Sequence, residues 1–379
     1  MEPPLDDQTL ADPMEVTVGG RTLSAWTSVE VDRPLDAATG SFRLSINLDA
    51  SRGLPVKPYQ EIEIQVEGEL LLTGYVDAVD SESGKDSRTI IVSGRDTTAD
   101  LVDSSSLDPA LANVTLQKIA ETLSTPFGIE VAPRFPAEKD FPSVVFTVSP
   151  GETAFAAIER AARLRGLLVF TRGDGRLAIE APAQGVADVP LEEGRAGNVL
   201  KSRLSYSNAN RFQTYIVRGQ SPGTDFASGA FVAGVEGRGG DLQVDRYRPL
   251  VILAPASVTE SEAIELAKWE ATVRAARSSK LVVEVAGWRQ SLTARPGLTP
   301  GTSKSARLWA VNELVRVLVP TQEIEGRMLV NRARFRRSRK TGTKTSLELI
   351  REDAYETKPS VTTEEDPFGS LLTDQPLGG

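Results

Sequence analysis

The chain has 379 residues, with 43 lysines and arginines against 52 aspartates and glutamates, and it contains neither cysteine nor histidine. These two absences exclude disulfides, thiolate and imidazole metal sites, and histidine-based catalytic triads, so an enzyme would have to rely on carboxylates. The formal net charge of −9 argues against general DNA binding, because duplex affinity comes largely from cationic side chains on phosphates.

Residues 1–13 are acidic and proline-bearing, which predicts a flexible tail and no signal peptide. No apolar run approaches the length of a membrane segment. Residues 14–100 alternate polar and apolar side chains in several short stretches, the pattern of half-buried strands. A hairpin is predicted at Gly19-Gly20, which β-forming residues flank. We therefore expect residues 14–100 to form a first small antiparallel β-barrel domain.

Residues 101–196 have a mixed pattern that predicts an α+β domain with two helices and a hairpin. Apolar side chains recur at helical spacing over residues 116–123. Ser149 and Glu152 have the spacing of a capping box, which predicts that the second helix starts there. A hairpin is expected around residues 172–175.

Strand patterning returns in residues 197–258 and 281–355, which together predict a second β-barrel domain. Residues 259–280 interrupt this pattern as a helix inserted between its strands. The helix begins with a capping box formed by Thr259 and Glu262. The predicted fold class is therefore β-rich α+β and multidomain, with two similar small antiparallel β-barrels and a mixed α/β insert.

Two segments lack the apolar side chains needed to offset chain ordering, and both are expected to be mobile. The first is the glycine-rich loop of residues 221–240. Its last part, residues 234–240, superficially resembles a nucleotide-binding loop but does not connect a strand to a helix. The second is the C-terminal tail of residues 356–379, which is predicted to be disordered.

Residues 59–96 and 311–353 share one layout: a strand, a turn, a longer strand, a polar loop and a further strand. Any antiparallel meander has this appearance, so the pattern alone does not prove a repeat. A true duplication would give each chain two similar barrels, which matters for a ring assembly.

Basic residues cluster in the longer strand of the second copy, where Arg332, Arg334 and Arg336 alternate and share one face. Ala333 and Phe335 lie on the opposite face and are the expected core contacts. The arginine face is either a solvated edge or a docking surface for an acidic partner or neighbouring subunit. If its charges are merely exposed, reversing them should leave the fold intact. The candidate interface residues are Arg332, Arg334, Arg336, Arg337, Arg95 and Asp96.

Asp96, Asp100 and Asp103 could offer oxygen ligands to a cation, but their spacing is not that of a calcium loop. Structural roles explain them better, and Arg95 and Asp96 are more consistent with turn or interface ion pairs than with catalysis. No catalytic residue, cofactor or metal site is predicted.

Several short segments keep a fixed order between about residue 15 and residue 355. They are Gly20-Arg21, Trp26-Thr27-Ser28-Val29, Thr73-Gly74-Tyr75-Val76-Asp77, Gly94-Arg95-Asp96-Thr97-Thr98-Ala99-Asp100-Leu101-Val102-Asp103, Glu159-Arg160-Ala161-Ala162-Arg163-Leu164-Arg165-Gly166, Arg246-Tyr247-Arg248-Pro249-Leu250 and Gly287-Trp288. In this order they resemble the baseplate hub (tail) proteins of Mu-like contractile phages. The GRDTTADL stretch at residues 94–101 is the most specific of them.

The resemblance implies a non-enzymatic homotrimer in the virion tail baseplate, assembled in the host cytoplasm. Three chains with two barrels each would form a ring of pseudo-six-fold character. That ring would join the hexameric tail tube, or a distal tail protein, to the trimeric central spike and would contact other baseplate proteins. DNA would pass through its channel without specific binding. The alternative is a carbohydrate-active or cell-surface-binding β protein with carboxylate chemistry, for which 6% aromatic residues offer few sugar platforms.

Overall fold

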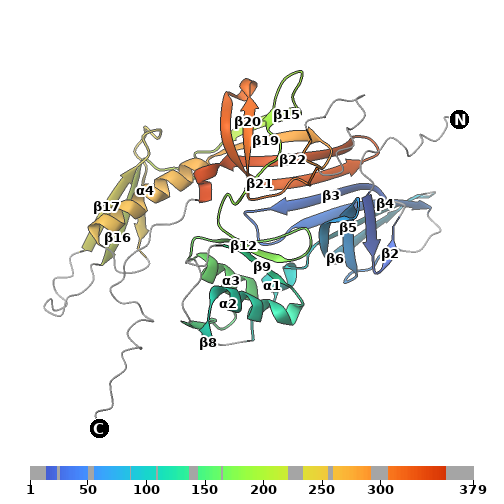
Figure 1. Cartoon of the computed structure of the whole chain (residues 1–379), viewed down its shortest axis with the longest axis horizontal. Helices are drawn as coiled ribbons and strands as arrows, with labels where there is room; N and C mark the ends of the chain where they lie inside the picture. Colours follow the sequence, from blue (N-terminus) through green and yellow to red (C-terminus); the bar gives the residue numbers. More distant parts are fainter. Residues whose placement is uncertain are drawn as a thin grey trace, which may run out of the picture.

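The computed structural model describes residues 14–23, 26–49, 55–85, 87–107, 110–135, 144–163, 165–220, 234–254, 259–291 and 306–355. Its largest element is a 14-stranded, mostly antiparallel sheet that contains strands from both ends of the chain (Figure 1). The expected tails at residues 1–13 and 356–379 lie outside the described residues. None of the helices in the described ranges combines the length and apolarity needed to cross a bilayer.

The N-terminal module of this sheet has the strand order β3-β4-β7-β6-β5-β1-β2. Its strands are β1 (Met14–Val18), β2 (Arg21–Thr22), β3 (Trp26–Pro34), β4 (Ser41–Asp49), β5 (Glu61–Val66), β6 (Glu69–Ser83) and β7 (Ser87–Asp96). The predicted hairpin at Gly19-Gly20 is confirmed by the pairing of β1 with β2. Alternate side chains along each strand enter the core, as Ile62, Ile64 and Val66 do on β5.

The C-terminal module repeats the central part of this order as β15-β19-β22-β21-β20. Its strands are β15 (Val199–Tyr206), β19 (Ser279–Ala286), β20 (Glu313–Val319), β21 (Ile324–Ser338) and β22 (Gly342–Arg351). The short strands β13 (Gly185–Val186) and β14 (Leu191–Glu192) lie parallel to β20, and the 3-10 turns η4 (Pro320–Gln322) and η5 (Glu352–Tyr355) follow β20 and β22. The shared strand order confirms the repeat suggested by the sequence.

The two modules meet where β21 pairs antiparallel with β3, from Arg332 opposite Pro34 to Ser338 opposite Ser28. Their apolar side chains form one continuous core. Within it, the Trp288 and Phe335 rings meet edge to face at a centroid distance of 6.1 Å, and both side chains are fully buried. The burial of Ala333 and Phe335 confirms the expectation that these residues face the core.

The α+β domain lies beside the N-terminal module and has a core of its own (Figure 1). Its elements are α1 (Ala99–Asp103), β8 (Ala110–Val114), α2 (Leu116–Ser124), η2 (Thr125–Phe127), β9 (Val131–Arg134), β10 (Val144–Thr147), α3 (Ala154–Arg163), β11 (Leu168–Thr171) and β12 (Leu177–Glu180). The hairpin expected around residues 172–175 is confirmed by the pairing of β11 with β12.

Helix α3 begins at Ala154, not at Ser149 as its sequence predicted. Gly151 has a φ of +80°, a left-handed conformation that an α-helix does not accommodate. The Glu152 carboxylate does accept a hydrogen bond from the Ser149 N–H at 2.9 Å, but this bond closes a turn before the helix. The Thr153 hydroxyl instead accepts a hydrogen bond from the Ala156 N–H in the first turn.

Residues 214–220, 234–240 and 249–253 form a sheet of their own, whereas the sequence pattern had placed them in the second barrel. This sheet has the order β17-β16-β18, with β16 (Thr214–Gln220), β17 (Gly234–Gly240) and β18 (Pro249–Leu253). Helix α4 (Glu260–Arg277) packs on it, and the capping box of Thr259 and Glu262 is confirmed. We call β16–β18 and α4 the α4 unit, which projects to one side of the molecule (Figure 1).

The expected loop of residues 221–240 is wrong at its end, because residues 234–240 form β17; residues 221–233 lie outside the described residues. The glycines of this strand bring its backbone against the α4 backbone. A Cβ atom on Gly237 would lie 2.2 Å from the Ala263 carbonyl carbon, and one on Gly239 would lie 2.7 Å from that of Ala267. The missing side chains therefore permit close packing rather than mobility.

Gly237→Ala should lower the free energy of unfolding of the α4 unit by roughly 1–3 kcal/mol. The added methyl group would collide with backbone atoms of α4, which cannot move aside as a flexible side chain can. Limited proteolysis and thermal unfolding would measure this loss. Gly234→Ala is the matched control on the same strand, since a Cβ atom there meets nothing within 4 Å. Equal stability of the two variants would contradict the close-packing explanation.

Candidate functional site

The arginine face of β21 lies against acidic side chains of the same chain. Arg334 is opposite Asp32 of β3, and Arg336 is opposite Glu30. The Arg336 Nε lies 2.9 Å from a Glu30 carboxylate oxygen, and the Arg334 Nε lies 3.3 Å from Asp32. The acidic partner that the sequence analysis expected for these arginines therefore includes the first long strand of the chain itself.

Arg332 extends this ladder by binding Asp32 and Asp36, with an Arg332–Asp36 distance of 3.1 Å. Burial alone would raise the pKa of Asp36, but hydrogen bonds from Arg332 and Asn331 outweigh it and hold the pKa below its usual value. Arg332, Arg334 and Asp32 are partly buried, whereas the side chains of Arg336 and Glu30 are 45% and 40% exposed. The three arginines therefore join the two modules through ion pairs near the surface. That these arginines also bind a neighbouring subunit or another protein remains a prediction.

Arg337 does not share this face. Its position in β21 puts it on the side of Ala333 and Phe335, where it is buried and its guanidinium lies 5.5 Å from the centre of the Trp26 ring. The structure therefore separates Arg337 from the other interface candidates on β21.

Arg95 and Asp96 adjoin on β7 and point to opposite faces. The Arg95 guanidinium binds both carboxylate oxygens of Asp103, at 2.6 and 3.0 Å, and its Nε lies 2.9 Å from Asp77. The hydrogen bonds from Arg95 lower the pKa of Asp103. This cluster ties β6, β7 and α1 together on the surface.

Asp96 is buried where the N-terminal module meets the α+β domain. Its carboxylate accepts hydrogen bonds from the Thr98 hydroxyl at 2.6 Å and from the Gly40 N–H at 2.5 Å. The Thr98 hydroxyl also lies 2.5 Å from that of Thr171 on β11. Burial raises the pKa of Asp96 to about 6, although these hydrogen bonds oppose the shift.

The three aspartates considered as cation ligands are not brought together. Asp103 is bound by Arg95, while Asp96 is enclosed by Thr98 and Gly40. Among the described residues, no three acidic side chains cluster in a way that could hold a metal ion.

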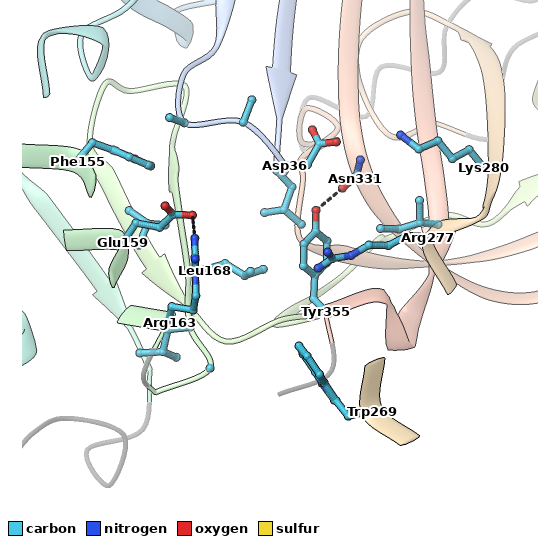
Figure 2. A pocket seen from close by; sticks show the side chains of 17 residues that line it. Asp36, Phe155, Glu159, Arg163, Leu168, Trp269, Arg277, Lys280, Asn331 and Tyr355 are labelled. Atoms are coloured by element: carbon cyan, nitrogen blue, oxygen red, sulfur yellow. Dashed lines mark hydrogen bonds and ion pairs between the residues drawn. The ribbon is translucent and has the colours of Figure 1, made fainter. Parts of the chain in front are cut away.

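A cavity of about 650 Å³ lies where the α+β domain, the α4 unit and the C-terminal module meet (Figure 2). The Tyr355 hydroxyl donates to the Asn331 amide oxygen at 2.7 Å, and the Arg277 guanidinium lies 5.0 Å from the centre of the Tyr355 ring. Burial raises the pKa of this tyrosine. Lining charges are also paired, as Glu159 is with Arg163, so the cavity has the chemistry of a packing junction.

The sequence analysis missed the acids of β3, although a signal was present. Glu30 and Asp32 alternate along a predicted strand as the arginines of β21 do, with the opposite sign. Two strands that carry opposite charges at alternate positions are candidates for pairing, even when about three hundred residues separate them in the chain.

Together, the repeated β modules and the α+β domain define a multidomain, β-rich protein with the fold of the phage-tail hub class. Three family models match the chain: "Mu phage baseplate assembly protein GpP-like, N-terminal" at residues 13–96, "Baseplate hub protein gp44-like, second domain" at residues 98–181, and "Mu phage baseplate assembly protein GpP, fourth domain" at residues 259–358. The chain belongs to the baseplate hub proteins of Mu-like phages.

Relatives agree with this assignment. The baseplate hub protein gp44 of Escherichia phage Mu is 28% identical over 358 residues, which is 91% of this chain and 89% of that protein. The 43 kDa tail protein of prophage MuSo2 from Shewanella oneidensis has a TM-score of 0.76 at 29% identity, covering 91% of this chain and 99% of that one. A tail protein from Neisseria meningitidis has the same fold, with a TM-score of 0.72 at 22% identity and coverage of 91% and 98%.

The ladder between β21 and β3 can be tested by exchanging one pair of charges. Arg336→Glu would face Glu30 across the strands, and like charges there should lower the free energy of unfolding by up to about 1 kcal/mol. Adding Glu30→Arg should restore only part of the loss, as measured by denaturant unfolding, because the Glu30 carboxylate also lies 3.4 Å from Arg334. This replaces the expectation that charge reversal on the arginine face leaves the fold unaffected. Simple addition of the two single costs would show that the pair does not interact.

Asp96 predicts a pH dependence of stability. Its pKa rises from 3.8 to about 6 on folding, so the folded chain binds more protons in that window and loses stability as pH rises through it. Relative to Asp96→Asn, the parent should lose on the order of 3 kcal/mol of unfolding free energy between about pH 4 and pH 7. Unfolding curves of both proteins at several pH values measure this; a constant difference would contradict it.

Proposed function

We propose that this hub protein forms a homotrimeric ring of pseudo-six-fold character that joins the hexameric tail tube to the trimeric central spike. The observation that carries the proposal is the shared strand order of the two β modules. Three chains with two equivalent modules each present six similar units, which suits a six-fold tube on one side and a three-fold spike on the other.

A closed ring leaves a central opening, through which we propose that DNA passes without being held. Each chain carries a formal charge of −9, so the net field of a ring of three chains opposes the binding of phosphate. The proposed neighbours are the tube or a distal tail protein, the spike and other baseplate proteins. Assembly would take place in the host cytoplasm.

The proposed role is structural and involves no catalysis. The carbohydrate-binding alternative requires exposed aromatic platforms, but Trp288 and Trp309 are buried in the core. Trp26 lies under the Arg337 guanidinium, and Trp269 lines the packing junction of Figure 2. Three tyrosines, Tyr59, Tyr206 and Tyr247, are exposed, but they belong to three different parts of the chain: before β5, at the end of β15 and before β18.

The ring can be tested on the purified chain. At micromolar concentration, light scattering should give three times the chain mass of 40.8 kDa, and negative-stain images should show an annulus with six-fold modulation. Fluorescence anisotropy of a labelled DNA duplex should stay unchanged at ~0.15 M salt. A mass of one chain at every salt concentration would refute the trimer, and submicromolar duplex binding would refute the passive channel.

A further inference from the structure

Besides the two-residue strands β2, β13 and β14, two strands of the large sheet have long unpaired edges in the described part of the chain. Strand β15 pairs only with β19, so its outer edge is open. In β6, the residues up to Tyr75 pair with β5, but residues 78–83 pair only with β7. An open strand edge is a template for pairing with another chain unless something covers it.

The edge that is open on β6 has a paired counterpart on β21 in the C-terminal module. Strands β6 and β21 are both 15 residues long, and each has a one-residue bulge, at Asp77 and at Asn331. The first half of each strand pairs with the preceding strand, β5 or β20. The second half of β21 pairs with β3, whereas the second half of β6 is open.

The open strand β15 is the repeat equivalent of β3. The equivalence follows from the residue just before each bulge and the residues opposite it on successive strands. In the N-terminal module these residues are Val76, Gly94, Phe42 and Val31. In the C-terminal module they are Val330, Leu349, Leu281 and Leu204. Leu204 therefore occupies the place of Val31. The joint between β21 and β3 thus has an unformed counterpart between β6 and β15.

This equivalence fixes a register for the counterpart. Phe335 lies opposite Val31 in the formed joint, and its equivalent on β6 is Ser81. Ser81 therefore belongs opposite Leu204. The pair next to it is Glu82 opposite Arg203, which takes the place of Arg336 opposite Glu30 with the two charges exchanged.

The exposed chemistry of the two edges fits this register. Asp80 and Glu82 give β6 an acidic edge, and Lys201 and Arg203 give β15 a basic one. Within the described residues, no salt bridge involves any of these four. The equivalents of Asp80, Glu82 and Arg203 in the formed joint, which are Arg334, Arg336 and Glu30, are all paired, and Lys201 takes the place of Ser28. Apolar groups are exposed as well: Tyr206 is 68% exposed, and the register places it opposite Val79.

We propose that residues 78–83 of β6 in one subunit pair antiparallel with β15 of the next, with Glu82 opposite Arg203. This inference rests on the proposed trimer and names the surface that closes it. Joints within and between chains would alternate around the ring. The exchange of charge sign also discriminates between them, because β6 against β3, or β21 against β15, would place like charges face to face.

Cysteine cross-linking tests the register without background, because the chain has no cysteine. Glu82→Cys with Arg203→Cys should give covalent dimers and trimers on a non-reducing gel. Glu30→Cys with Arg336→Cys is the equivalent pair within one chain. It serves as the positive control with which the oxidant or short cross-linking reagent is chosen. Glu82→Cys with Lys201→Cys is the register control, two residues out of place on the same face, and should give several-fold less product.

Light scattering on the same samples measures the oligomeric state independently of cross-linking. It therefore distinguishes failure of the β6–β15 joint from failure of the trimer. Covalent trimers from the in-register pair, and few from the shifted pair, support the joint. A trimeric particle in which the in-register pair does not link overturns the joint but leaves the trimer standing. A monomer refutes the trimer and the joint with it. In addition, Glu82→Arg or Arg203→Glu alone should raise the concentration at which trimers dissociate, and the double exchange should restore it.

Discussion

The pairing of β21 with β3 is the constraint on which the rest of the molecule depends. Backbone hydrogen bonds join strands from opposite ends of the chain, and the arginine ladder with Glu30, Asp32 and Asp36 fixes which residues meet. A slip of one residue would turn Phe335 out of the core and the arginines into it. The joint therefore holds the two β modules in one orientation and unites their cores.

Electrostatic interactions in this protein serve geometry rather than chemistry. Arg95 clamps Asp77 and Asp103 on the surface, and Asp96 is buried under hydrogen bonds that link β7 to the α+β domain. A chain without histidine and cysteine can still place charges accurately, because carboxylates and guanidinium groups match in shape as well as sign.

The strands and helices were largely predictable, because amphipathic alternation and a capping box are local signals that the structure confirms at β5 and at Thr259. The repeat was visible for the same reason. Contacts between distant parts of the chain were not predictable. Nothing in the local sequence separates β16–β18 from the second module. The glycines of β17 predict a loop, because the sequence does not show that α4 packs against them. Likewise, Arg332 and its neighbours were identified as an interface face, but the acids opposite them belong to a strand three hundred residues away.

The separation of β3 from β21 along the chain also sets the order of events during synthesis. The outer edge of β3 stays uncovered until residues 332–338 have left the ribosome, about three hundred residues after β3 itself. Contacts of such long sequence separation form slowly, and uncovered edges attract other chains while they wait. The nascent protein thus carries a risk of mispairing at this edge until β21 emerges, and a chain terminated before residue 332 would keep the edge uncovered.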